Sequence, residues 1–461
     1  MIKTRNRSER EMKQTDVLVI GGSAAGLVAA STAKAYHPDK SVLAVRREPE
    51  AMIPCGIPYI FGTLDSSEKN ILPDALATNP GAEVLIGDVT GIDRENKKCV
   101  LADGTEISFE KLIIATGSTP VVPGWLKGAD KKNVYTIPKI KSYLDDIKGG
   151  LSGFKKIVTI GAGFIGVELS DELNKAGIDV TLVEILPRIL GTAFDEEVAA
   201  DAEAALKEKG VNVITGKGVK EILGNGSVEG VILDSGEKLE ADAVVLSMGY
   251  RPNTELAEKA GIKLNERGFI CVDEYMRTDD NHIFAAGDCA EKRDFITRKP
   301  STVMLASTAC AEARVAGMNL YDLSSVKSFG GTIAIYSTAI GDHGFGTAGL
   351  TEEAARREGF DVVTGSFSGM DRHPGAFADA HKQMVKLVVT RDCGTVIGGE
   401  VIGGLSAGEL TNVIGFIIQN RMSVSSVLTS QIGTQPLLTA SPAAYPLIKA
   451  AEMAVKRLRK Q

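Results

Sequence analysis

The stretch KKIVTIGAGFIGVELSDELNKAGIDVTLVEILPRIL, residues 155–190, decides the fold class. The apolar strand KIVTI runs into Gly161, Gly163 and Gly166, and a helical pattern follows. Glycines at this spacing let the backbone approach a pyrophosphate, which then lies on the free N–H groups of the helix start. A second strand, DVTLVE, ends in Glu184. The stretch therefore predicts a βαβ unit that binds a dinucleotide; a unit that carries the spacing by coincidence is the alternative.

The acid that ends this second strand predicts which dinucleotide binds. A carboxylate at the position of Glu184 accepts hydrogen bonds from both ribose hydroxyls and repels a 2′-phosphate. We therefore expect NADH to be preferred over NADPH.

A related but partial pattern lies in DVLVIGGSAAGLVAASTAKAY, residues 16–36. A short apolar strand leads into a tight turn from Gly21 to Gly26, and an alanine-rich helix follows. Ser23 stands where the strict pattern has its middle glycine, so a plain strand-to-helix turn is the alternative. Two dinucleotide folds in one chain imply two nucleotides that exchange electrons.

Two further strand ends agree with a second nucleotide. KLIIATGSTP, residues 111–120, is an apolar strand that runs into a small flexible turn, and HIFAAGDCA, residues 282–290, ends in Gly287 and Asp288. A carboxylate at such a strand end can hold a hydroxyl of a polyol. An aspartate that merely caps a turn is the alternative interpretation.

The composition excludes several classes of protein. A chain of 461 residues with 44% hydrophobic and 24% charged residues is typical of a globular protein with two or three domains. A net charge of −7 argues against a nucleic-acid partner, and no segment predicts a membrane span or a secretory signal. The six cysteines form no CxxC pair, so we expect no metal site, no disulfide framework and a cytoplasmic location.

Taken in order, GGSAAG, ATGSTP, GAGFIG, MGYRPNTEL and AAGDCA resemble the FAD-dependent pyridine nucleotide–disulfide oxidoreductases from about residue 15 to the C-terminus. The resemblance implies that FAD lies on the first turn and NADH on the second. For FAD it implies contacts with Gly21, Gly22, Ser23, Gly26, Thr116, Gly117, Gly287 and Asp288. For NADH it implies contacts with Gly161, Gly163, Gly166, Glu184 and Gly249, and Glu168 matches an acid that faces the nicotinamide–flavin region.

The sequence departs from this family in two places. The FAD ribose is usually held by an acid at the end of the second strand, but SVLAVRREPE has Arg46 and Arg47 there. Either Glu48 substitutes for the acid or the arginines cover the adenine. The chain also lacks the second redox cysteine and the C-terminal His–Glu pair of the best-known branch, so Cys55 stands alone.

The segment around Cys55, AMIPCGIPYIFGTL (residues 51–64), resembles the single-cysteine branch, which contains coenzyme A-disulfide reductases, NADH-dependent persulfide reductases and water-forming NADH oxidases. That chemistry needs a thiolate beside the flavin. We expect Gly56 to let the backbone pass close to the flavin ring and Pro58 to occupy the first turn of a helix. Cys55 is then expected at a helix N-terminus, where the dipole favours the thiolate. The other five cysteines are expected to be packing residues.

The predicted fold is α/β, with two Rossmann-like domains and a C-terminal α+β domain. The FAD domain is expected to be discontinuous, at 14–122 and 269–330, with the NADH domain at 123–268 inserted. By resemblance, residues 331–461 form a dimerisation domain, so we expect a homodimer. Residues 1–13 are expected to be a flexible extension.

The favoured function is transfer of electrons from NADH through FAD to Cys55, which reduces a small disulfide, persulfide or polysulfide. Substrates of the coenzyme A type are favoured, with coenzyme A a further candidate ligand. The alternatives are an NADH oxidase that reduces O2 through a cysteine sulfenic acid, and an NADH-responsive redox sensor. Tyr445 is either a proton donor to a leaving thiolate or an ordinary interface tyrosine.

Overall fold

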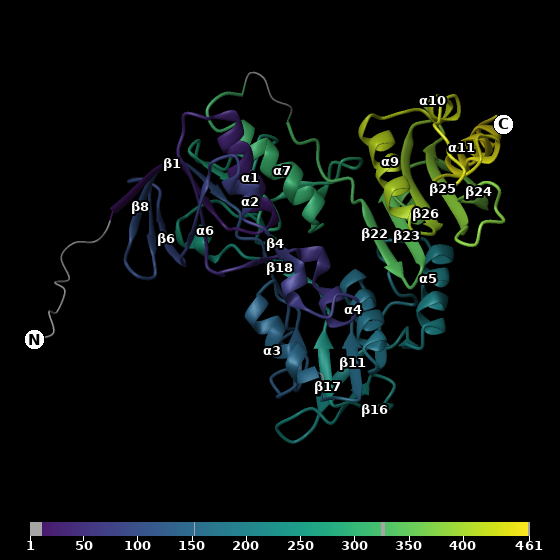
Figure 1. Ribbon diagram of the computed structural model, residues 1–461, viewed down its shortest axis with the longest axis horizontal. Helices are drawn as coiled ribbons and strands as arrows, with labels where there is room; N and C mark the ends of the chain where they lie inside the picture. The colour runs from purple at the N-terminus through teal and green to yellow at the C-terminus, as the bar shows by residue number, and fades with distance from the viewer. Residues whose placement is uncertain (1–11, 152, 324–327, 460–461) are drawn as a thin grey trace, which may run out of the picture.

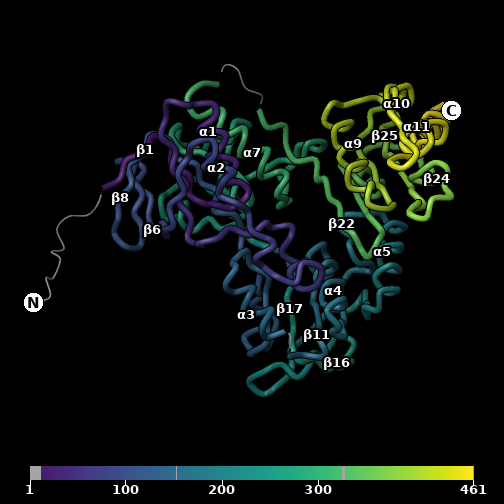
Figure 2. Tube along the Cα trace, viewed as in Figure 1, coloured from purple at the N-terminus to yellow at the C-terminus, as the bar shows by residue number. Residues whose placement is uncertain are grey.

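The computed structural model describes residues 12–151, 153–323 and 328–459, which form three α/β units (Figure 1). The N-terminal unit lies on the left of Figure 1, the middle unit at the bottom, and the C-terminal unit on the upper right. Figure 2 shows the chain returning to the N-terminal unit before it continues to the C-terminal one.

The N-terminal unit is built on a seven-stranded sheet of order β5-β2-β1-β8-β7-β6, with β19 paired to β8. Its central strands β1, β2 and β8 are parallel, and the runs Val17–Ile20, Val42–Val45 and Leu112–Ile114 at their C-terminal ends are apolar and buried. Helices α1 (Ala24–Tyr36) and α7 (Ala306–Met318) pack together on one face. The strands are β1 (Met12–Ile20), β2 (Val42–Arg46), β5 (Glu83–Ile86), β6 (Val89–Asp93), β7 (Lys98–Leu101), β8 (Glu106–Ile114) and β19 (Ile283–Ala285).

The middle unit repeats the same design on a five-stranded parallel sheet of order β10-β17-β11-β12-β13. Its strands are β10 (Val134–Thr136), β11 (Lys156–Ile160), β12 (Asp179–Val183), β13 (Asn212–Ile214) and β17 (Ala243–Leu246). Its helices are α3 (Lys141–Leu151), α4 (Phe164–Lys175) and α5 (Glu196–Glu208). A small antiparallel sheet, β14 (Val219–Leu223), β15 (Gly230–Leu233) and β16 (Lys238–Glu240), extends it.

The C-terminal unit is an antiparallel sheet of order β22-β23-β26-β25-β24 covered by helices. Its strands are β22 (Tyr336–Ile340), β23 (His343–Gly349), β24 (Val362–Met370), β25 (Lys382–Thr390) and β26 (Val396–Gly403). Its helices are α8 (Glu352–Arg357), α9 (Ala407–Gln419), α10 (Val424–Leu428) and α11 (Pro446–Leu458). Strands β22 and β23 extend toward α4 and α5 of the middle unit (Figure 2).

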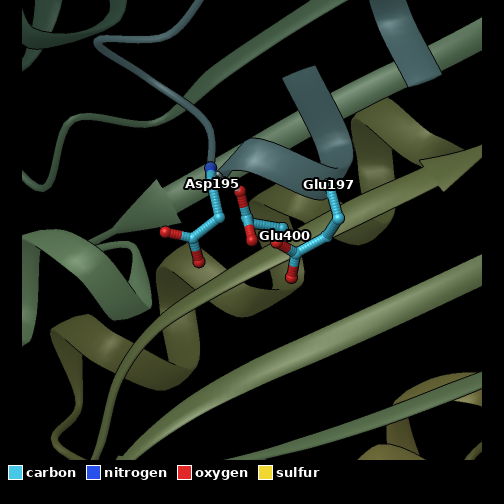
Figure 3. A group of neighbouring side chains, drawn as sticks. All are labelled: Asp195, Glu197 and Glu400. Atoms are coloured by element: carbon cyan, nitrogen blue, oxygen red, sulfur yellow. Dashed lines mark hydrogen bonds between the residues drawn. The ribbon is translucent and has the colours of Figure 1, made fainter. Parts of the chain in front are cut away.

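A largely buried ionic cluster, with one exposed member, joins the C-terminal unit to α5. Asp195 and Glu197 lie at the start of α5, and Glu400 lies on β26 (Figure 3). The Lys386 Nζ atom lies 2.8 Å from Asp195 and 3.7 Å from Glu400, and it also contacts Glu197 and, at 3.5 Å, Glu352, so one ammonium serves four carboxylates. Glu400 also accepts the backbone N–H of Asp195, at 2.7 Å. Burial and the nearby Asp195 charge raise the pKa of Glu400 to about 8.

The predicted α/β class, with two similar parallel-sheet units and a C-terminal α+β unit, is confirmed. Most of the extension predicted for residues 1–13 lies outside the described residues, but Met12 and Lys13 already belong to β1, where they pair with β8. Within the described ranges, no helix combines the length and apolar character that a membrane span needs.

Candidate active site

The glycine-rich turn after β1 is shaped by close packing that excludes side chains. Gly21 has a φ of +120°, and its N–H donates to the Val45 carbonyl at 2.8 Å. A Cβ atom on Gly21 would lie 2.1 Å from the Ala115 carbonyl oxygen, and one on Gly26 would lie 2.0 Å from the Gly21 oxygen. Ser23 is the N-cap residue of α1, and its side chain makes no capping bond. The geometry fits a dinucleotide phosphate on the N–H groups that begin α1.

The turn after β11 has the same geometry. Gly161 has a φ of +98°, and its N–H donates to the Val183 carbonyl at 2.9 Å. A Cβ atom on Gly166 would lie 1.9 Å from the Gly161 oxygen. Glu184 follows β12, and its carboxylate accepts the backbone N–H of Ala162 at 2.6 Å, so it lies against the turn. Gly163 is the N-cap residue of α4, and Gly249 has a φ of +91° with open space beside it.

The strand ends at Thr116 and Asp288 lie together. The Thr116 hydroxyl donates to the Asn253 carbonyl at 2.6 Å, and Gly117 has a φ of +70°. Asp288 accepts hydrogen bonds from Ser118 at 2.7 Å and from Lys139 at 2.8 Å. Burial opposes ionisation of Asp288, but Lys139 and Ser118 hold its pKa below the usual value. The Asp288 carboxylate is therefore held by Ser118 and Lys139 where the two strand ends meet.

Gly287 is held by a second buried pair. It has a φ of +83°, and its N–H donates to Glu312 at 2.8 Å. The buried Lys292 donates to the Gly287 carbonyl at 3.1 Å and lies 3.9 Å from Glu312. Burial, moderated by Lys292, raises the pKa of Glu312 to about 7.

Cys55 is exposed and is the middle residue of a 3-10 helix, Pro54–Gly56, which a second 3-10 helix, Pro58–Phe61, follows. Pro58 occupies the first position of a helix, as expected, but Cys55 lies within a separate 3-10 turn and not at the N-terminus of an α-helix. Pro58 has no N–H to donate to the Pro54 carbonyl, so the first α-helical bond cannot form, and the N–H of Ile57 bonds to that carbonyl instead.

The expected stabilisation of the Cys55 thiolate is also wrong for these surroundings. The protein atoms around the sulfur raise the pKa of the Cys55 thiol, and the Glu168 carboxylate raises it further. The Lys139 ammonium acts in the opposite direction. Lys139 therefore connects two centres, because it also bonds Asp288.

Glu168 belongs to α4, and Thr338 of β22 donates a hydrogen bond to it at 2.8 Å. Burial outweighs this bond and raises the pKa of Glu168 to about 7. Burial and Glu168 also raise the pKa of Tyr59. The thiol of Cys55, the phenol of Tyr59 and the acid of Glu168 thus share one electrostatic environment.

At Gly56 a side chain is excluded by a neighbouring residue of the protein, apart from any approach of the flavin. A Cβ atom at this position would lie 1.9 Å from the Oδ1 atom of Asn70. The Asn70 side chain is fixed by its bond to the Ile53 carbonyl at 3.0 Å. Downstream, Glu172 of α4 accepts the Thr63 hydroxyl at 2.9 Å and anchors the segment that carries Cys55.

The remaining predicted residues lie elsewhere. Tyr445 is the N-cap residue of α11 and packs against the core of the C-terminal unit. Burial there raises the pKa of its phenol. Within one chain, Tyr445 belongs to a different unit from Cys55. Arg46 is buried and forms an ion pair with Asp74, whereas Arg47 is exposed and bonds Glu48 at 3.1 Å. Local sequence patterns carry no signal for Lys139, Thr338, Glu172 or Asp74.

Two family models match this chain. The model described as pyridine nucleotide-disulphide oxidoreductase matches residues 15–313, and the model for the dimerisation domain of the same family matches residues 335–444. The first model belongs to enzymes that depend on FAD and NAD(P)H.

Individual proteins are similar over most of the chain. An NADH oxidase of Methanocaldococcus jannaschii is 31% identical over 96% of this chain and 99% of its own length. An NAD(P)H coenzyme A polysulfide/persulfide reductase of Pyrococcus horikoshii is 33% identical over 85% of this chain and 88% of its own. The solved structure of an NAD-dependent persulfide reductase from A. fulgidus is 32% identical, with a TM-score of 0.86 over 96% of this chain and 83% of that chain.

Proposed function

We propose that this chain, which belongs to the pyridine nucleotide-disulphide oxidoreductase family, carries electrons from NADH through FAD to Cys55 and on to a small disulfide, persulfide or polysulfide. The two interactions of the Lys139 side chain carry the proposal. Its ammonium bonds Asp288, at the strand end assigned to FAD, and its charge also acts on the Cys55 thiol. An exposed cysteine coupled in this way is suited to accept electrons from a flavin and pass them to the sulfur of a substrate.

The cofactor assignments rest on the two glycine turns. We assign the FAD pyrophosphate to Gly21, Gly22, Ser23 and Gly26, the FAD path to Thr116, Gly117, Gly287 and Asp288, and NADH to Gly161, Gly163, Gly166, Glu184 and Gly249. The corresponding domains are 14–122 with 269–330 for FAD, and 123–268 for NADH. FAD held by these residues would supply two-electron chemistry between NADH and Cys55.

Cys55 carries out the sulfur exchange. Its thiolate attacks one sulfur of the substrate, which forms a mixed disulfide and releases the first substrate thiolate. Two electrons then cleave the mixed disulfide, which releases the second thiolate and restores Cys55. One disulfide, one NADH and one proton therefore become two thiols and NAD⁺. Glu168, whose pKa is about 7, exchanges a proton beside this centre near neutral pH.

Coenzyme A disulfide or persulfide is the favoured substrate, and coenzyme A is a candidate ligand. The relative from Pyrococcus horikoshii, which is named for coenzyme A polysulfide and persulfide, supports this choice. Oxygen is the second candidate acceptor, because the relative from Methanocaldococcus jannaschii is named an NADH oxidase. In that case Cys55 would cycle through a sulfenic acid.

We also propose a homodimer formed through residues 331–461. The match to a dimerisation domain supports it. Exposed apolar side chains on this unit also support it, among them Leu405, Phe416 and Leu438. A dimer would bring the partner's C-terminal unit into reach of the active site, which is where Tyr445 would act. Light scattering of the purified protein should give twice the chain mass.

The Cys55→Ser variant tests the proposal. NADH should still bleach the bound flavin, because hydride transfer does not need the thiol. Turnover of coenzyme A disulfide or persulfide should fall at least about a thousandfold, because an alcohol neither ionises near pH 7 nor forms a mixed disulfide. The Cys393→Ser variant, which removes another exposed cysteine, should keep full turnover. Near wild-type turnover by Cys55→Ser would show that the thiol only packs.

Mass spectrometry of the non-reduced protein separates the two acceptors. A thiol adduct on Cys55 supports the disulfide or persulfide reaction. Oxidation of Cys55 without such an adduct supports the oxidase, if an oxygen electrode also shows rapid oxygen consumption with no thiol product.

A further inference from the structure

The two nucleotide units can be aligned by their strand registers, and the alignment reveals a reversal of charge. Ile20 pairs with Val45 in the first sheet, and Ile160 pairs with Val183 in the second. The glycine that follows each first strand donates to the carbonyl of that paired residue, Gly21 to Val45 at 2.8 Å and Gly161 to Val183 at 2.9 Å. The next residue is Arg46 in the first unit and Glu184 in the second. Arg46 therefore occupies the position that carries an acid in the other unit.

The glycine turn is adapted to this arginine. Glu184 bonds the N–H of Ala162, the residue after the first glycine of its turn. The counterpart of Ala162 in the first unit is Gly22, and a Cβ atom there would lie 2.6 Å from Cδ of Arg46. The stem of Arg46 thus lies against the turn where Glu184 places its carboxylate in the other unit.

The guanidinium of Arg46 is occupied by protein acceptors. Its Nε donates to the Glu48 carbonyl at 2.8 Å, and its Nη2 donates to the Pro49 carbonyl at 2.6 Å. Both terminal nitrogens donate to the Asp74 carboxylate, the Nη2–Oδ2 distance being 2.9 Å. Because Arg46 is only 8% exposed, these bonds fix Asp74 on a guanidinium whose stem lies against Gly22 of the turn.

The carboxylate of Asp74 remains accessible. Its side chain is 38% exposed, and each oxygen keeps a lone pair that Arg46 does not use. Ribose hydroxyls are donors that need such acceptors, and a guanidinium cannot accept from them.

We propose that Asp74, held by Arg46, supplies the carboxylate that binds the adenosine ribose hydroxyls of FAD. The inference rests on FAD being the cofactor of this unit. It replaces both alternatives drawn from the sequence, Glu48 as the acid and the arginines as a cover for the adenine. The acid comes from the turn between β4 (Ile71–Leu72) and α2 (Ala75–Thr78), far along the chain from the strand end that normally carries it.

The test is titration of the apoprotein with FAD, followed by quenching of flavin fluorescence. The Asp74→Asn variant should bind FAD about tenfold more weakly, since it loses charge-assisted hydrogen bonds. The Asp74→Glu variant should stay within about threefold of the wild type. The control is Asp279→Asn, which removes another arginine-paired aspartate of similar exposure and should leave FAD binding unchanged.

A FAD analogue that lacks the adenosine 2′- and 3′-hydroxyls separates a direct role from a structural one. The Asp74→Asn substitution should not weaken binding of this analogue. An equal loss for FAD and the analogue, or a loss in Asp74→Glu as large as in Asp74→Asn, would overturn the inference. If Asp74→Asn binds FAD as tightly as the wild type and NADH still reduces its flavin, the role of Asp74 is overturned but the proposed function stands. If the wild-type apoprotein binds no FAD, the proposed function is overturned as well.

Discussion

At the scale of single residues, Glu184 makes the choice of nicotinamide nucleotide testable. Its carboxylate is held against the turn by the Ala162 N–H, where a 2′-phosphate would meet its charge. We expect a higher kcat/KM for NADH than for NADPH. The Glu184→Gln substitution should reduce that preference by about tenfold, because it removes the repulsion. A preference for NADPH in steady-state kinetics of the wild type would contradict the assignment.

Glu168 makes a second prediction, on the acidity of the thiol. Because its negative charge raises the pKa of Cys55, Glu168→Gln should lower that pKa and favour the thiolate at neutral pH. The pH profile of Cys55 alkylation by iodoacetamide, followed by mass spectrometry, should move to lower pH. The Lys139→Met variant should move the profile to higher pH, since Lys139 acts in the opposite direction. Profiles that stay in place in both variants would show that neither charge reaches the sulfur.

At the scale of elements, the two short helices around Cys55 depend on close packing. A methyl group added at Gly56 would collide with Asn70, which is buried and bonded to Ile53. Gly56→Ala should therefore destabilise the protein by about 1–3 kcal/mol. Urea unfolding measures the cost, and in Gly56→Ala/Asn70→Ala the two losses should be less than additive. Full additivity would mean that the two positions do not interact.

The sequence predicted those elements whose signal is local. The strands that end at Ile20 and Ile160, and the glycine turns after them, follow from apolar runs and glycine spacing over a few residues. Cys55 was expected at a helix N-terminus, but Pro58 has no N–H to donate to the Pro54 carbonyl, so a 3-10 turn forms at Cys55 in place of an α-helical one.

The contacts that complete the site could not be predicted, because each joins distant parts of the chain. Lys139 and Asp288 are 149 residues apart, and Glu168 and Thr338 are 170 residues apart. No periodicity or motif pairs residues over such separations. Asp74 could not be predicted for the same reason. The sequence shows only that Arg46 stands where an acid is expected, and it does not show that Arg46 bonds Asp74.

At the scale of the whole molecule, the cluster around Lys386 gives a pH dependence of stability. The pKa of Glu400 is about 8 in the folded protein, so folding favours its protonated form. Protonated Glu400 therefore contributes its full share of the folding stability below pH 4.5, the ordinary carboxyl pKa. That contribution is lost as the pH rises from 4.5 toward 8, because the unfolded chain releases the proton more readily. The free energy of unfolding should fall over this range by roughly 2–4 kcal/mol.

Thermal and urea unfolding between pH 5 and pH 9 measure this effect. The Glu400→Gln variant, which cannot ionise, should show a flatter profile than the wild type. The matched control is Glu197→Gln, whose side chain contacts the same lysine but is largely exposed, and it should keep the wild-type slope. Parallel profiles for Glu400→Gln and the wild type would contradict the prediction.

The pairing of β19 with β8 has a consequence for the order of events on the ribosome. Among the described residues, the edge of Leu112, Ile113 and Ile114 that faces away from β1 is paired with Ile283–Ala285, and residues 115–282 are made in between. Because the chain is synthesised at about 5–20 residues per second, that edge stays unpaired for roughly ten to thirty seconds. The inserted unit can complete its own sheet during this interval, while the first unit stays open. The newborn chain therefore passes through a period in which it is vulnerable to aggregation, and a chaperone that shields strand edges would act then.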